Sequence, residues 1–259
     1  MLKIKSLSKT YMNENKEIEA LRNIDVNINE KEFVVLVGKS GCGKTTLLKC
    51  IAGLINPTKG EVNLNGKKII KPVKDIGFIF QDFSLFPWLT VRENIEFGLR
   101  LQKKSKKEID DIVNYYLNIT GLNNFADTHP KNLSGGMKQR VAIARTLANS
   151  PKFILMDEPF GSLDNLSRTK MQKFLIELWE REHKTIVFVT HDVEEALLLA
   201  DKIYVMSKRP GNIFECLNIH FKRPRKLELK NSKEFIELKN KIIGLLEESK
   251  TSFVSSTMY

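Results

Sequence analysis

A glycine-rich segment near the amino terminus has the residue types and spacing of a phosphate-binding loop. Residues 38–45 read GKSGCGKT, which fits the pattern G-x-x-x-x-G-K-[ST]. In this pattern the glycines let backbone N–H groups turn toward phosphate oxygens, and the following helix adds the positive end of its dipole. Lys44 is expected to reach the terminal phosphates, and Thr45 is expected to coordinate Mg²⁺. The residues expected to contact nucleotide here are Gly38, Ser40, Gly41, Cys42, Gly43, Lys44, Thr45 and Thr46.

Two adjacent carboxylates follow an apolar run in the second half of the chain. Residues 153–158 read FILMDE, which predicts a buried strand that delivers both acids at its end. Asp157 is expected to hold Mg²⁺, and Glu158 is the candidate general base that orients and polarises an attacking water. Acids often end strands, so this pair gains its meaning from the phosphate loop upstream. Together the two segments indicate hydrolysis of a nucleoside triphosphate.

A second segment also has the features of a phosphate site. Residues 133–140 read LSGGMKQR and precede the apolar, helix-like stretch VAIARTLA. The Ser134 hydroxyl can donate to a phosphate oxygen, and Gly135 and Gly136 permit close approach of the backbone at a helix N-terminus. An ordinary N-capped helix is the alternative interpretation of this segment taken by itself.

The elements that must position these residues alternate in a recognisable way. The first eighty residues contain short apolar or alternating runs separated by turn signals, which predicts a sheet-rich region. Residues 90–148 show helical spacing, and two apolar strands with a helix-like segment between them follow Pro151. This strand–helix–strand order favours parallel pairing. The tail from Asn231 to Lys250 again has helical spacing.

Composition and charge limit the class of protein. The chain has 259 residues, of which 42% are hydrophobic and 28% charged, as expected for a globular protein with a substantial core. No apolar run is long enough to cross a bilayer, and the basic amino terminus lacks the apolar segment of a secretory signal, so we expect a cytoplasmic chain. The net charge of +11 indicates a lysine-rich surface, with attraction to an acidic membrane surface as the alternative.

Six segments in fixed order resemble the ATP-binding cassette (ABC) ATPases over nearly the whole chain, and other phosphate-loop proteins lack the LSGGM segment. The segments are the phosphate loop at 38–45, Gln81 in FIFQD, LSGGM at 133–137, FILMDE at 153–158, GSLD at 161–164 and His191 in VTHD. The resemblance implies an α/β fold: a P-loop NTPase of the ABC ATPase type. Its RecA-like core would carry an antiparallel β subdomain and an inserted α-helical subdomain. The implied boundaries are an ABC ATPase domain at 1–230, with the helical subdomain at about 86–150, and a C-terminal helical tail at 231–259.

The resemblance also implies an arrangement of two chains and a role for each motif residue. In this family the LSGGM segment serves the nucleotide bound by the other copy, so two head-to-tail chains would enclose two ATP molecules. Gln81 would sense Mg²⁺ and water, His191 would contact the γ-phosphate, and Asp164 would couple the two sites across the interface. Tyr11 matches the position whose ring stacks on adenine, with a core tyrosine as the alternative. The implied catalytic residues are Lys44, Gln81, Glu158 and His191, and the implied Mg²⁺ ligands are Thr45, Gln81 and Asp157.

The stretch after Gln81 is similar to importer cassettes. The segments FPWLTV, LSGGMKQRVAIARTL, EPFGSLD and FKRPR most resemble the nitrate, sulfonate and taurine importer subgroup. In such importers a groove in this region receives a coupling helix of the permease. An amphipathic surface formed by four residues suits that docking, and burial within the chain is the competing interpretation. These residues are Phe83, Phe86, Trp88 and Leu89.

The implied partners are a second copy of the chain, transmembrane permease subunits and, indirectly, an extracytoplasmic solute-binding protein. The implied location is peripheral, at the cytoplasmic face of the cell membrane, and no nucleic acid is expected. The alternative is a soluble ABC ATPase that acts on nucleic acid or in translation, but such proteins usually carry paired cassettes or long insertions, which this sequence does not show. The transported solute is determined by the permease and binding protein rather than by this chain.

Overall fold

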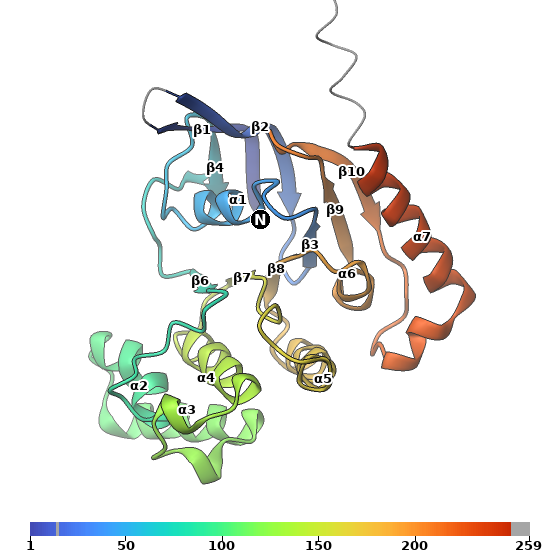
Figure 1. Ribbon diagram of the computed structural model, residues 1–259. Helices are drawn as coiled ribbons and strands as arrows, with labels where there is room; N and C mark the ends of the chain where they lie inside the picture. Colours follow the sequence, from blue (N-terminus) through green and yellow to red (C-terminus); the bar gives the residue numbers. More distant parts are fainter. Residues whose placement is uncertain (14–15, 250–259) are drawn as a thin grey trace, which may run out of the picture. The chain divides into compact units, whose positions relative to one another are not determined.

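The computed structural model describes residues 1–13 and 16–249, which form two compact units. The first unit combines the described residues of 1–73 with residues 183–249, and the second is Lys74–Glu182 (Figure 1). The helical insertion expected at about 86–150 lies within the second unit. The described part of the tail expected at 231–259 lies in the first.

The first unit contains an antiparallel sheet with the strand order β2-β1-β4-β5. Its strands are β1 (Leu2–Asn13), β2 (Lys16–Ile28), β4 (Lys59–Leu64) and β5 (Lys67–Lys68). Where β1 begins and β2 ends, alternate residues are apolar and buried, and the register pairs Leu2 with Ile28 and Ile4 with Val26 on the covered face.

A second set of strands in this unit has the order β10-β9-β3-β8. These strands are β3 (Phe33–Val37), β8 (Thr185–Thr190), β9 (Lys202–Met206) and β10 (Ile213–Asn218). β3 pairs in parallel with both β8 and β9, and every residue of β3 and β8 is buried, as expected for parallel strands covered on both faces. β10 is antiparallel to β9. The carboxyl ends of β3 and β8 therefore share one edge.

Three α-helices belong to the described part of the first unit: α1 (Lys44–Ile51), α6 (Val193–Leu199) and α7 (Lys233–Glu248). α6 packs on β3 and β8, while α7 packs on α6 and β9 (Figure 1). The short 3₁₀ helix η3 (Leu227–Asn231) contacts both α6 and α7. The C-terminal segment is thus packed against the helix that follows β8.

The second unit contains the parallel pair β6 (Ile76–Ile79) and β7 (Phe153–Asp157) together with four α-helices. The helices are α2 (Val91–Leu101), α3 (Lys106–Thr120), α4 (Gly135–Ala148) and α5 (Asn165–Glu182), with the 3₁₀ helices η1 (Asn123–Phe125) and η2 (Pro130–Asn132) between α3 and α4. Thr90 with Glu93 and Ser105 with Glu108 form capping boxes that begin α2 and α3. α2 packs on both α3 and α4, which gives this helical region its core.

Candidate functional site

The phosphate loop leaves the end of β3 and enters α1. Gly41 and Gly43 have φ values of +78° and +105°, in the left-handed region that glycine adopts without steric cost. The Lys44 side chain is buried, at 4% exposed, and its Nζ donates to the carbonyl oxygens of Gly38 at 2.7 Å and Lys39 at 3.1 Å. The loop thus combines an ammonium group with the N-terminus of α1, a combination that suits phosphate.

Two backbone segments support the loop from behind. A Cβ on Gly43 would lie 2.8 Å from the Ala20 carbonyl oxygen of β2, and a Cβ on Gly211 would lie 2.0 Å from the Cys42 carbonyl oxygen. Gly211 is itself fixed, because its N–H donates to Ala20 O at 2.9 Å and its own carbonyl accepts from Arg22 N at 2.9 Å. The sequence pattern does not single out Gly211. Residues 209–212 read RPGN, which indicates a turn, but the contact of this turn with the phosphate loop arises from tertiary packing.

Replacing Gly211 with alanine is expected to lower ATP affinity at least about tenfold, which corresponds to about 1.4 kcal/mol. The added methyl group cannot fit beside the Cys42 carbonyl, and the turn is pinned to β2, so the phosphate loop must shift. Titration with a fluorescent ATP analogue measures the affinity. Gly244→Ala is the matched control, because a Cβ there meets nothing within 4 Å. Wild-type affinity in a folded Gly211→Ala variant would rule out this role.

His191 follows the strand that pairs with β3. Val37 and Thr190 are register partners, so Gly38 and His191 are the next residues beyond the same sheet edge. The His191 side chain is exposed. Parallel pairing in the first unit therefore brings the predicted phosphate loop and the predicted γ-phosphate contact to one edge.

In the second unit, the parallel pair β6 and β7 likewise brings predicted site residues together, namely Gln81, Asp157 and Glu158. Ile79 pairs with Met156, so Asp157 at the end of β7, Glu158 after it and Gln81 after β6 lie at one edge of this pair. A Cβ on Gly161 would lie 3.6 Å from Gln81 Nε2 and 3.9 Å from Glu158 Cβ, so both side chains flank the same turn.

The two acids differ in their surroundings. Asp157 is buried at the end of β7, whereas Glu158 is half-buried and has a φ of +43°. A non-glycine residue in the left-handed region is strained, and such strain tends to occur at functional sites. The Glu158 carbonyl accepts from Gly161 N at 3.0 Å, which closes the turn that holds this conformation.

The LSGGM segment begins α4. The Ser134 Oγ accepts from Met137 N at 3.3 Å, which makes Ser134 the N-cap. Ser134 is exposed, a Cβ on Gly136 would meet nothing within 4 Å, and a Cβ on Gly135 would lie 3.1 Å from Leu163 Cδ2. Ser134 therefore caps α4, and this helix N-terminus also opens to the surface, where a second molecule could reach it.

Asp164 immediately precedes α5, and its neighbour Leu163 lies against Gly135 of this segment. Its Oδ1 accepts from Ser167 N at 2.9 Å, and the hydrogen bonds from Ser167 lower the pKa of the Asp164 carboxyl. The exposed carboxylate is therefore ionised at neutral pH.

Tyr11 lies on β1, opposite Ile18 of β2. Its side chain is 38% exposed, and the Lys9 ammonium lies 5.2 Å from its ring centroid. The structure therefore excludes the core-tyrosine interpretation and leaves a ring face at the surface.

An aromatic cavity of about 760 Å³ lies in the second unit, next to the stretch after Gln81. Phe86 lines it and packs on Phe97, with ring centroids 4.5 Å apart, while the Arg145 guanidinium lies 5.4 Å from the Phe86 ring. The other lining residues include Phe78, Phe80, Gln102 and Asn149. Of the four residues expected to form a docking surface, Trp88 is 69% exposed, whereas Phe83, Phe86 and Leu89 are half-buried.

Comparison with known proteins places these features in a family. Residues 21–161 match the family model described as ABC transporter. The chain is 46% identical to the nitrate import ATP-binding protein NrtD of Synechocystis sp. in an alignment of 256 residues that covers 96% of this chain and 96% of the relative. It is 43% identical to the aliphatic sulfonates import ATP-binding protein SsuB of Bacillus cereus over 244 residues, 94% of this chain and 95% of the relative.

A solved structure of the ATP-binding cassette MJ0796, a dimer in a post-hydrolysis state bound to ADP and Pi, is also similar. It shares 37% identity with this chain at a TM-score of 0.75 and covers 86% of this chain and 100% of its own. The likeness confirms the ABC ATPase fold expected from the sequence.

Proposed function

Because the chain belongs to the ABC transporter family and is an ATPase of that family, we propose that it is the ATP-hydrolysing subunit of an importer. The proposed importer is of the nitrate, sulfonate or taurine type, and relatives named for nitrate import and for aliphatic sulfonates import, at 46% and 43% identity, support the first two. The chain lies at the cytoplasmic face of the membrane and binds there to a separate permease. None of the helices in residues 1–13 and 16–249 has the length and apolar character needed to cross a bilayer.

The structural observation that carries the proposed ATP-hydrolysing role is the exposed N-terminus of α4, because it supports an ATP site shared by two chains. One chain has two helix N-termini suited to phosphate: that of α1 behind its phosphate loop, and that of α4 behind Ser134. Since Gly136 faces open space, the second terminus is free to serve a nucleotide held by another copy. Two chains arranged head to tail would each supply one half of two ATP sites, and the dimeric state of the related solved cassette supports this arrangement.

In the proposed reaction, Glu158 accepts a proton from a water molecule whose oxygen attacks the γ-phosphorus. The bond from that phosphorus to the bridging oxygen breaks, and ADP leaves with the electron pair. His191 contacts the γ-phosphate, and Lys44 neutralises charge on the phosphates. Thr45, Gln81 and Asp157 would hold Mg²⁺ through oxygen atoms of the type that it prefers, and the ion would neutralise further charge on the phosphates.

The remaining predicted residues are assigned to nucleotide binding or to coupling between the two ATP sites. The nucleotide phosphates are assigned to backbone and side chains of the loop, and the Tyr11 ring is assigned to adenine, since its exposed face can stack on any base. Ser134, Gly135 and Gly136 serve the partner's nucleotide, and Asp164 couples the two sites. The loop residues are Gly38, Ser40, Gly41, Cys42, Gly43, Lys44, Thr45 and Thr46.

The permease is proposed to dock at the aromatic cavity of the second unit. Phe97 lines this cavity and remains 38% exposed, and polar groups of Gln102 and Arg145 lie at the same cavity. A short amphipathic helix with apolar side chains toward the phenylalanine rings suits such a surface.

Phe97→Asp is expected to reduce recovery of the permease with the tagged chain at least about tenfold, because a carboxylate would be buried against phenylalanine rings. Membranes from the native host supply the permease, and mass spectrometry of the captured multi-span protein identifies it. Phe125→Asp is the matched control, since Phe125 is 39% exposed on η1 and does not line the cavity. Equal recovery with both variants would refute docking at this cavity.

A further inference from the structure

The two residues that flank His191, Thr190 and Asp192, form hydrogen bonds with the first turn of α6. The Thr190 hydroxyl donates to Glu195 Oε2 at 2.7 Å and accepts from Asp192 N at 3.0 Å. Asp192 Oδ1 accepts from Glu194 N at 2.8 Å and from Glu195 N at 3.1 Å, which makes Asp192 the N-cap. Both residues that flank His191 are therefore hydrogen-bonded to the first turn of α6.

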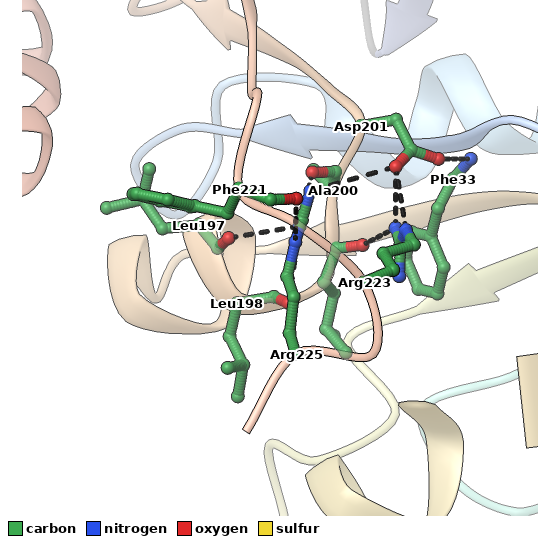
Figure 2. A network of polar contacts seen from close by, with 9 residues as sticks. Phe33, Leu197, Leu198, Ala200, Asp201, Phe221, Arg223 and Arg225 are labelled. Carbon is green, nitrogen blue, oxygen red and sulfur yellow. Dashed lines mark hydrogen bonds and ion pairs between the residues drawn. The ribbon is translucent and has the colours of Figure 1, made fainter. Parts of the chain in front are cut away.

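The C-terminal end of α6 is held by two arginines from the segment after β10. The buried Arg225 donates to the carbonyl oxygens of Leu197 and Leu198 at 3.3 Å and of Ala200 at 2.6 Å (Figure 2). These are carbonyls at the end of the helix, where no further turn supplies an N–H.

Arg223 extends this attachment to the sheet. It donates to Leu199 O at 2.7 Å and pairs with Asp201 at 2.7 Å, and the other Asp201 oxygen accepts from Phe33 N at 2.9 Å (Figure 2). The end of α6 is thereby fixed to the beginning of β3, the strand that leads to the phosphate loop.

The first turn of α6 is held by the C-terminal helix. Glu194 pairs with Lys239 of α7 at 2.6 Å and with Lys230 of η3 at 3.4 Å. The Lys239 hydrogen bond is the largest cause that lowers the pKa of the Glu194 carboxyl, so the ion pair is intact at neutral pH.

We infer that the segment from Phe221 to Lys239 positions α6 and thereby His191, so that it controls the rate of γ-phosphate cleavage rather than the affinity for ATP. The segment holds both ends of α6, the helix that begins two residues after His191. It meets β3 through Asp201 at Phe33, which lies at the opposite end of that strand from the phosphate loop. This inference rests on the proposed role of His191. Glu194 and Arg225 are thus positioning residues.

Reversing the charge of Glu194 tests the inference, because Glu194→Lys sets a lysine against Lys230 and Lys239. We expect about a tenfold lower kcat with an unchanged Kd for ATP, and a shifted imidazole NMR signal for His191. The chain has four histidines, so the His191 signal can be assigned by its loss in His191→Gln. Adding Lys239→Glu to Glu194→Lys restores an opposite pair and is expected to recover most of the kcat and the signal position.

Glu237→Lys is the control, because it breaks the Lys233–Glu237 pair within α7 and leaves the contacts with α6 intact. A wild-type kcat and His191 signal in folded Glu194→Lys would overturn the inference. An equal fall of kcat in Glu194→Lys and in the control Glu237→Lys would also overturn it. If Glu194→Lys does not fold, Glu194→Gln replaces it in the same measurements. We then expect a smaller decrease in kcat, again with an unchanged Kd for ATP. Full turnover in His191→Ala would instead remove the proposed role of His191.

Discussion

Glu158→Gln is expected to slow steady-state ATP hydrolysis at least about 100-fold, equivalent to about 2.7 kcal/mol of transition-state stabilisation. The amide keeps the size of the side chain but cannot accept the proton of the attacking water. Phosphate release at saturating ATP and Mg²⁺ measures the rate.

The effect is expected to be confined to the chemical step. ATP affinity should stay within about twofold of wild type, since general-base loss removes an interaction made in the transition state. Glu177→Gln is a suitable control, because Glu177 is an exposed residue of α5 in the same unit. A rate in Glu158→Gln close to that of Glu177→Gln would assign the base to another group.

Lys44→Ala is expected to weaken ATP binding by roughly 10- to 150-fold, corresponding to the 1.5–3 kcal/mol of a hydrogen bond to a charged group. The ammonium is held at the loop by the carbonyls of Gly38 and Lys39, so its position does not depend on a distant partner. Titration of the purified chain with a fluorescent ATP analogue gives the dissociation constant.

Ser134→Arg is expected to differ from Lys44→Ala in its effect on ATP binding. Ser134 is assigned to the nucleotide of the other copy, so one chain carrying Ser134→Arg should bind ATP normally while hydrolysis is lost. Weak ATP binding by the separated Ser134→Arg chain would contradict that assignment, and normal binding by Lys44→Ala would contradict the role of the phosphate loop.

The parts of the site that the sequence predicted are those in which neighbours in the chain act together. The loop at 38–45 could be predicted from its own glycines, the strand before it and the helix after it, because all three are local in sequence. The helices within residues 90–148 could be predicted for the same reason. Thr90 and Ser105 each form an N-terminal cap with the glutamate three residues later in the chain.

The parts that the sequence did not predict depend on distant contacts. Gly211 lies at the Cys42 carbonyl only because β9 and β10 bring their turn to β2, and no local pattern encodes that approach. Glu194 and Lys239 are 45 positions apart and meet only because α7 packs on α6. The segment FKRPR carried a family resemblance, whereas its contacts with the α6 carbonyls emerged from the fold.

The central claim is that each catalytic site needs two chains, and the mass of the Glu158→Gln variant in solution tests it most directly. Light scattering during size-exclusion chromatography should give the 29.8 kDa chain without nucleotide and about twice that mass with ATP and Mg²⁺. If the variant binds ATP yet keeps the mass of one chain at every concentration, and wild type hydrolyses ATP at that same mass, the composite site is wrong.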